Sequence, residues 1–174
     1  MKILSDNPPE NPQGYFKVHK LTLQNKKNGQ VVREYLNSKD AVCAVVFDSI
    51  KNKYIFVKQF RPGPKIPLIE LCAGMVDKVG EAEIETMKRE ILEEIGYQVD
   101  TINLLVKTYY TSPGKTNERM TTYFVTVSKK IAQGGGLESE NEEIDIIELT
   151  KEEIKKTEFV DGKTLLALAV LKLK

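Results

Sequence analysis

The sequence predicts a mixed α/β fold of strands with one central helix and two helices near the C-terminus. Apolar residues alternate or cluster in short β-rich segments before residue 75, as they do in strands. Over residues 81–95 they recur every three to four positions, as in an amphipathic helix. The 174 residues fit one domain with a sizeable core, and no repeat or long linker divides them.

Two segments near the N-terminus predict a β-hairpin. Residues 16–24 alternate, Lys27-Asn28-Gly29 forms a turn, and residues 31–36 supply the partner strand. Residues 15–36 could form a small subdomain or an arm exchanged in a dimer, and the residues themselves favour neither alternative.

The predicted central strands follow in quick succession. Segments 41–48 and 53–60 are β-rich and are separated by a turn. Regular structure is expected to end at residues 61–64, Arg-Pro-Gly-Pro, and 68–72 predicts a short strand that leads to Gly74.

All the predicted helices lie after residue 80. The helix at 81–95 is expected to end at Gly96, which suits a C-terminal cap. Further strands are predicted at 103–110, 119–128 and 144–149, and a glycine-rich acidic loop occupies 133–143. Helices at 150–159 and after the N-cap residue Asp161 close the chain.

The overall charge excludes several classes of partner. With 26 Lys+Arg against 25 Asp+Glu, no global field attracts nucleic acid or an anionic membrane. The most apolar stretch, 165–173, is too short for a membrane span, and the polar, proline-rich N-terminus does not resemble a signal peptide. Cys43 and Cys72 lie in apolar segments, as reduced thiols do. We expect a soluble, cytoplasmic protein without a zinc site.

The helix at 81–95 carries an unusual set of carboxylates. At about 100° per residue, Glu90, Glu93 and Glu94 fall in one arc, and the apolar residues occupy another, so the carboxylates are expected to face away from the core. Such a run can be a solvated face. However, Glu90 and Glu94 lie one turn apart with no cation between them, and a hard divalent cation would relieve their repulsion.

Residues 74–97, GMVDKVGEAEIETMKREILEEIGY, resemble the Nudix box, Gly-x5-Glu-x7-Arg-Glu-U-x-Glu-Glu-x-Gly-U, where U is a bulky aliphatic or aromatic residue. Every fixed position from Glu81 onward matches. Six residues rather than five separate Gly74 from Glu81, so the loop that enters the helix is one residue longer.

The resemblance implies a Nudix-type α/β/α sandwich with a mixed sheet in residues 39–174, preceded by a small β subdomain at 1–38 that forms a dimer. It also implies Mg²⁺, with Mn²⁺ as a substitute, and places Arg89 as an ion-pair partner of the glutamates. The implied metal ligands are the Ala73 carbonyl, Glu90, Glu94 and Glu142, and the implied catalytic residues are Glu93 and Glu140, with Glu140 as the general base.

Further segments are similar to one branch of the family, the ADP-ribose and GDP-mannose pyrophosphatases. Pro113 lies 16 positions beyond Tyr97, the acidic loop resembles the catalytic loop of that branch, and KILSDN, KQFR, ELCAG and DGKT resemble its GDP-mannose members. The implied reaction is attack of water on one phosphorus of a nucleoside-diphosphate sugar. The implied substrate contacts are Arg61, Tyr15, Phe16, Ser112, Pro113, Gly114 and Glu118.

Two other functions fit the same motif. One is a Nudix hydrolase of nucleoside triphosphates or dinucleoside polyphosphates, which Ser112-Pro113-Gly114 and the acidic loop disfavour. The other is a nucleotide-sugar sensor without catalysis, which the retained box glutamates disfavour. The base, the sugar and the number of metal ions are left open by the sequence.

Overall fold

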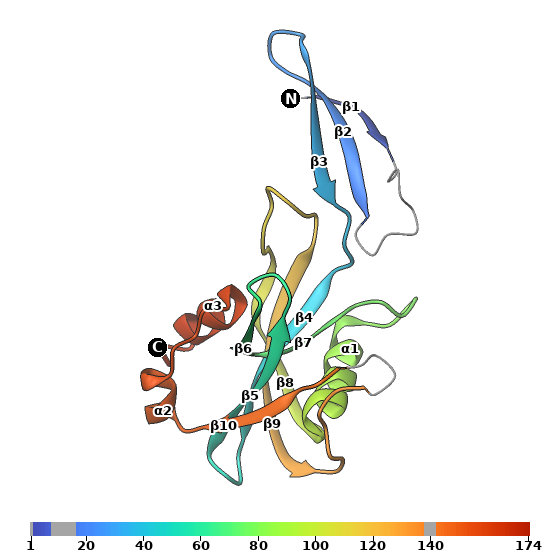
Figure 1. Ribbon diagram of the computed structural model, residues 1–174. Coiled ribbons are helices and arrows are strands. Elements are labelled where there is room, and N and C mark those ends of the chain that lie inside the picture. Colours follow the sequence, from blue (N-terminus) through green and yellow to red (C-terminus); the bar gives the residue numbers. More distant parts are fainter. Residues whose placement is uncertain (1, 8–16, 138–141) are drawn as a thin grey trace. The chain divides into compact units, whose positions relative to one another are not determined.

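The computed structural model describes residues 2–7, 17–137 and 142–174 (Figure 1). Two compact units make up the chain. Unit 1 contains Met1–Asp40 and Tyr110–Arg119, and unit 2 contains Ala41–Tyr109 and Met120–Lys174. Tyr15, Phe16 and Glu140, to which roles were assigned from the sequence, lie outside the described residues.

Unit 1 is built on a three-stranded antiparallel sheet in the order β1-β2-β3. The strands β2 (Val18–Gln24) and β3 (Gln30–Leu36) form the predicted hairpin. Its turn is stabilised by Asn25, whose Oδ1 accepts the backbone N–H groups of Lys27 and Gly29. The strand β1 (Lys2–Asn7) was not predicted, because this short polar segment lacks alternation and is held by backbone pairing with β2.

The segment Tyr110–Arg119 completes unit 1 from far along the sequence. The backbone N–H of Leu36 donates to the carbonyl of Lys115 at 2.8 Å, and Asn117 accepts the N–H of Ser38 at 2.8 Å. Arg119 also pairs with Asp40. No sequence signal indicated that this turn would join the N-terminal strands.

Unit 2 contains a seven-stranded mixed sheet. The main order is β10-β5-β4-β9-β8, with β4 and β9 parallel, while β6 pairs with β5 and β7 pairs with β4. The strands are β4 (Ala41–Asp48), β5 (Lys53–Arg61), β6 (Ile66–Glu70), β7 (Cys72–Met75), β8 (Tyr97–Tyr110), β9 (Arg119–Lys130) and β10 (Asp145–Leu149). The short strand predicted at 68–72 is therefore two strands, and Arg61, where regular structure was expected to end, is the last residue of β5.

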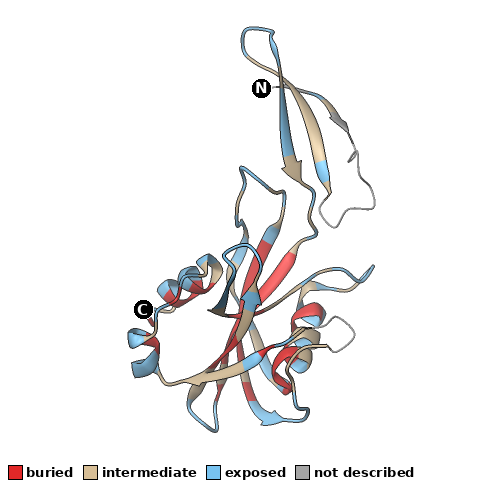
Figure 2. Cartoon of the chain, in the orientation of Figure 1, coloured by how far each residue is buried: buried red, intermediate tan, exposed pale blue. Residues whose placement is uncertain are grey.

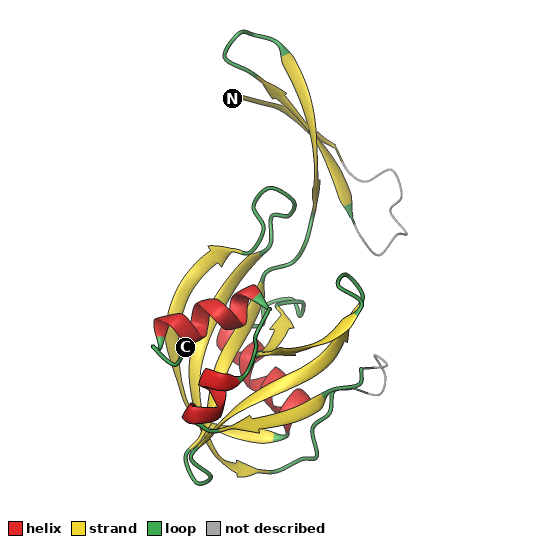
Figure 3. Cartoon of the chain, turned by 60° about the vertical axis from the view of Figure 1, so that its left-hand side comes forward, coloured by secondary structure: helices red, strands yellow, loops and turns green. Residues whose placement is uncertain are grey.

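Helices cover both faces of this sheet (Figure 3). The strand β4 is buried along most of its length (Figure 2). Its alternate residues Val42, Ala44 and Val46 pack on the side of the central helix, and the residues between them pack on the side of the C-terminal helices. The predicted α/β/α sandwich with a mixed sheet is confirmed.

The predicted central helix is an α-helix followed by a π-helical turn. The helix α1 spans Glu83–Glu90, the turn η1 spans Ile91–Ile95, and Gly96 ends it in the left-handed region at φ 79° as predicted. Because a π turn contains more residues than an α turn, the residues in it depart from the 100° spacing. The prediction that the carboxylates face away from the core is wrong for Glu94, which is 6% exposed, whereas Ile84 and Leu92 of the expected apolar stripe are exposed.

Both C-terminal helices begin after a capping residue, of which Asp161 was predicted. The helix α2 (Lys151–Lys156) starts after Thr150, which forms a capping box with Glu153. The helix α3 (Gly162–Val170) starts after Asp161, whose carboxylate accepts the N–H of Thr164 at 3.0 Å. Both cysteines are free and buried, as predicted. Among the described residues, no helix is long and apolar enough to cross a membrane.

The replacement Thr164→Val is expected to destabilise the fold by about 1–3 kcal/mol, because it leaves a buried N–H without an acceptor. The Thr164 hydroxyl accepts the N–H of Leu71 at 3.0 Å and donates to Asp161 at 2.6 Å, so it ties α3 to the junction of β6 and β7. Urea unfolding measures the change. The exposed Thr101→Val is the control, and equal midpoints for both variants would contradict the assignment.

Candidate active site

The carboxylates of Glu90 and Glu94 lie against β7. An ideal Cβ on Gly74 would fall 2.0 Å from Cδ of Glu90, so only a residue without a side chain allows this carboxyl group to approach the strand so closely. The backbone N–H of Ala73 donates to Oε2 of Glu94 at 3.1 Å. The end of the central helix and β7 therefore meet through two acidic side chains.

Burial and mutual repulsion make both carboxylates reluctant to ionise. Burial raises the pKa of Glu94 to about 8, with Glu90 and Glu142 adding to the rise against hydrogen bonds from Cys72 and Ala73. Burial also raises the pKa of Glu90 to about 7, opposed by Arg89 and increased by the charges of Glu93 and Glu142. The described part of the site is thus short of positive charge near neutral pH.

Arg89 organises the acidic groups at the outer side of this pair. Its Nη1 lies 2.7 Å from Glu90 and 2.9 Å from Glu93, and its Nη2 lies 3.4 Å from Glu81. Glu81 precedes the helix and also accepts a hydrogen bond from Thr86 at 2.9 Å. The longer entering loop therefore leaves Glu81 within reach of Arg89.

The glycine run of the acidic loop caps the π turn. The N–H of Gly135 donates to the carbonyl of Glu94 at 2.8 Å, and that of Gly136 to the carbonyl of Glu93 at 3.2 Å. A Cβ on Gly134 would lie 2.8 Å from the Glu94 carbonyl oxygen, and its φ of 73° also favours glycine. The glycines thus hold the start of the loop against the helix, close enough for the charge of Glu142 to affect Glu90 and Glu94.

Comparisons with known proteins show the family of this chain. Residues 37–168 match the NUDIX domain family. The chain belongs to the Nudix family. The GDP-mannose pyrophosphatases of Shigella flexneri and Escherichia coli O157:H7 are each 32% identical to this chain, in alignments that cover 99% of this chain and 92% of theirs. As a member of this family, the present chain is an enzyme that hydrolyses pyrophosphate bonds.

A solved structure shares the fold of this Nudix chain. The crystal structure of an ADP compounds hydrolase superposes with a TM-score of 0.79 at 17% sequence identity, covering 99% of this chain and 93% of that one. This likeness over nearly the whole of both chains supports the predicted fold.

Arg61 lies in unit 2 at the end of β5 and is paired with a buried carboxylate. Its Nε and Nη2 donate to the two carboxylate oxygens of Glu70 at 2.7 and 3.0 Å. Lys163 reaches the same carboxylate from α3. Glu70 and Lys163 were not predicted as functional residues, although they lie in ELCAG and DGKT, two segments that resemble the GDP-mannose pyrophosphatases.

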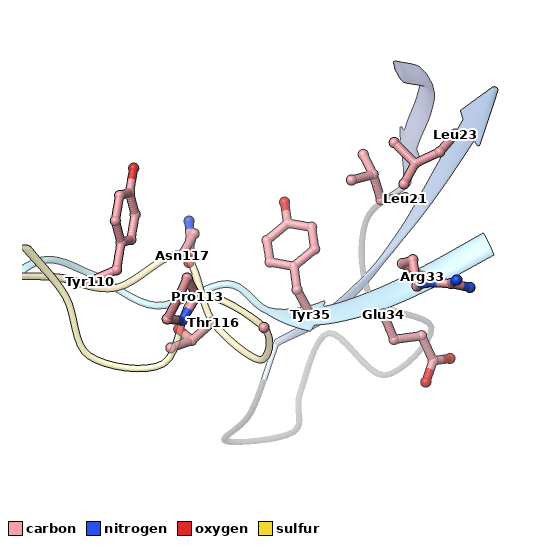
Figure 4. A pocket seen from close by; sticks show the side chains of 10 residues that line it. Leu21, Leu23, Arg33, Glu34, Tyr35, Tyr110, Pro113, Thr116 and Asn117 are labelled. Carbon is pink, nitrogen blue, oxygen red and sulfur yellow. The ribbon is translucent and has the colours of Figure 1, made fainter. Parts of the chain in front are cut away.

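The other predicted substrate contacts among the described residues lie in unit 1. Ser112 accepts the N–H of Lys115 in the predicted turn, and Glu118 accepts a hydrogen bond from Thr111 at 2.9 Å. A cavity of about 650 Å³ opens beside this turn (Figure 4). It is lined by Leu21, Leu23, Arg33, Glu34, Tyr35, Tyr110, Pro113, Gly114, Thr116 and Asn117.

The stability of the metal-free protein is expected to fall as pH rises from about 4.5 to about 8. In this window an unfolded Glu94 has lost its proton, while the folded pKa of about 8 keeps it bound, so rising pH favours the unfolded chain. Thermal unfolding in EDTA measures this. In Glu94→Gln the fall should shrink markedly, and an unchanged pH profile in that variant would exclude Glu94 as its source.

Proposed function

We propose that this Nudix enzyme is a magnesium-dependent nucleoside-diphosphate-sugar pyrophosphatase. It hydrolyses the diphosphate bridge and releases a nucleoside monophosphate and a sugar phosphate. The observation that carries the proposal is the pair of carboxylates formed by Glu90, which is mostly buried at the end of α1, and Glu94, which is buried in the turn η1. The substrate class is supported by relatives named GDP-mannose pyrophosphatase that match nearly the whole chain.

The residues at this site fit a hard divalent cation. Glu90, Glu94, Glu142 and the Ala73 carbonyl offer only oxygen atoms, which Mg²⁺ and Mn²⁺ prefer. Arg89 pairs with Glu90 and Glu93, but burial still raises the pKa values of Glu90 and Glu94, which indicates that these two charges are not fully compensated. The side chains alone do not complete the coordination, because the described residues contain no group of three or more His, Cys, Asp or Glu that could hold a metal ion. Water and substrate phosphates would supply further ligands.

The bound cation would neutralise negative charge on the phosphates, and the other tasks belong to the chain. Glu140 accepts the proton of the attacking water, and Glu93 assists beside the metal ligands. Arg89 holds Glu90 and Glu93 in place through its two short contacts. Arg61 binds the diphosphate, since its planar guanidinium group matches phosphate oxygens better than an ammonium group does.

We assign recognition of the nucleoside or the sugar to unit 1. Ser112, Pro113, Gly114 and Glu118 belong to the segment beside its cavity, whose wall includes Tyr35 and Tyr110 as surfaces for a planar ring. Tyr15 and Phe16 are proposed as further contacts from the same part of the chain.

We also propose that the enzyme is a homodimer formed through the N-terminal arm. Exposed apolar side chains on α3, Leu165, Leu166 and Val170, offer additional surface for association. Light scattering coupled to gel filtration determines the mass. A monomer at micromolar concentration would exclude this assembly without affecting the proposed chemistry.

A substrate panel tests the proposed function. ADP-ribose, GDP-mannose, UDP-glucose, dGTP and a dinucleoside polyphosphate are each incubated with Mg²⁺, with Mn²⁺ and with EDTA. A nucleotide sugar is expected to give the highest kcat/KM with either metal and no turnover in EDTA. Preference for dGTP or the polyphosphate would instead support a triphosphate-type Nudix hydrolase, and binding without turnover would indicate a sensor.

A further inference from the structure

A buried ion network lies behind Arg61. Glu70 is 2% exposed and accepts two side-on hydrogen bonds from the Arg61 guanidinium, at 2.7 and 3.0 Å. The two residues come from the paired strands β5 and β6, so the sheet fixes both backbones. Burial would raise the pKa of Glu70, but the hydrogen bond from Arg61 and the charge of Lys163 outweigh it and lower the pKa. Glu70 is therefore a buried anion at neutral pH.

The first turn of α3 holds the same carboxylate from another direction. Lys163 contacts Glu70 and lies 3.1 Å from Asp161, the residue that caps α3. Thr164 binds the backbone N–H of Leu71, next to Glu70. The carboxylate is thus held by a strand, a helix terminus and two cations, and its orientation is fixed before any ligand binds.

This arrangement determines which donors of Arg61 are available. The pairing uses the Nε–H and one Nη2–H, leaving the Nη1 donors and the second Nη2 donor for a ligand. The Arg61 side chain is 39% exposed, so solvent and ligands can reach it. The hydrogen bond to Glu70 is the main cause of the raised pKa of Arg61, and the charge of Glu94 adds to it, so the guanidinium lies within the field of the acidic site.

A buried ion pair is an inefficient way to stabilise a fold, because desolvation of the charges offsets much of their attraction. It is an efficient way to fix the plane of a guanidinium group, since two parallel hydrogen bonds define that plane. We propose that Glu70 is a positioning residue, which presents the free edge of Arg61 to the diphosphate of the substrate. The inference rests on the proposed function through the role given to Arg61.

A double-mutant cycle tests this proposal with Arg61→Ala, Glu70→Gln and the combined variant. Each single change is expected to raise KM for the preferred nucleotide sugar by about tenfold or more while kcat changes much less, because a misplaced contact weakens binding. The double variant should resemble Arg61→Ala, since Glu70 acts only through Arg61. The control is Glu148→Gln. This change removes the carboxylate that pairs with Lys51, outside the Arg61 network, and should leave KM unchanged.

Two outcomes overturn the proposal. One is a folded Glu70→Gln variant with the KM of the wild type. The other is a double variant whose rise in KM equals the product of the rises in the two single variants, since the two residues would then act independently. If Glu70→Gln does not fold, Glu70→Asp keeps the charge between the two cations but draws the carboxylate back by one methylene. The same rise in KM is then expected, and a wild-type KM for that variant overturns the proposal.

A second measurement separates this proposal from the proposed function. Binding of methylenediphosphonate, a diphosphate analogue that water cannot cleave, is measured calorimetrically with Mg²⁺. If the wild type cleaves no nucleotide sugar yet binds the analogue about tenfold more tightly than either single variant, the function fails and the positioning role stands. Equal binding by the wild type and Glu70→Gln overturns the positioning role whatever the substrate.

Discussion

Glu90→Gln and Glu94→Gln are each expected to lower turnover of the preferred nucleotide sugar by about a hundredfold or more. A Lewis-acid cation contributes several kcal/mol to phosphate chemistry, and each ~1.4 kcal/mol corresponds to a factor of ten in rate. Glutamine keeps the size of the side chain but loses the charge that binds the cation. Because the pKa values of about 7 and 8 show both charges to be unfavourable without a cation, the metal-free variants should be at least as stable as the wild type at pH 8.

The matched control is Glu85→Gln on the same helix. Glu85 is exposed and pairs with Lys88, so its replacement changes the net charge equally without reaching the buried pair. Turnover as a function of Mg²⁺ concentration is measured for all three variants. Full activity of both Glu90→Gln and Glu94→Gln at moderate Mg²⁺ would remove the metal assignment.

The parts of the fold that local sequence determines were predicted well. The strand at 41–48 matches β4 residue for residue, because a run of small and β-branched residues between turn signals has no good alternative. The caps Asp161 and Gly96 were found since capping depends on one residue type at one position. The box motif also located the acidic helix, because its fixed spacing is local.

Long-range arrangements were not predictable in the same way. The π turn changes the orientation of Glu94 where the glycine loop binds the helix end, and periodicity at 3.6 residues does not contain that information. Lys163 meets Glu70 across 93 positions of sequence, and Tyr110–Arg119 joins the N-terminal strands across a similar distance. Such pairings follow from sheet topology, which a single sequence constrains only weakly.

These long-range contacts explain why one short strand is important for the whole site. The strand β7 supplies Gly74 beneath Glu90 and the N–H that binds Glu94, while the residue before it, Leu71, is held by Thr164 of α3. Helix α3 also orients Glu70 through Lys163. The acidic pair and the Arg61 network are therefore anchored to neighbouring residues of one segment, and a change in that segment should affect both.

Gly74→Ala is the second change for which a large effect is expected. The new Cβ would lie 2.0 Å from Cδ and 2.1 Å from Oε1 of Glu90, far inside contact distance. Since the obstructed group is the end of a flexible side chain, the carboxylate should swing away while the backbone stays in place. Affinity for Mg²⁺ is then expected to fall about 10- to 100-fold, with a comparable loss of turnover, as for other changes that displace a metal ligand.

The control for this prediction is Gly63→Ala, where a Cβ would meet nothing within 4 Å. Both variants add one methyl group to a glycine in unit 2, so a difference between them isolates the displacement of Glu90.

If Gly74→Ala lost activity only because the protein unfolded, its melting temperature would fall in parallel and excess Mg²⁺ would restore nothing. A folded Gly74→Ala with wild-type affinity for Mg²⁺ would instead mean that the cation does not depend on the position of Glu90. Partial recovery at high Mg²⁺, with an unchanged melting temperature in EDTA, is the pattern that a displaced ligand predicts, because the remaining ligands still bind the cation weakly.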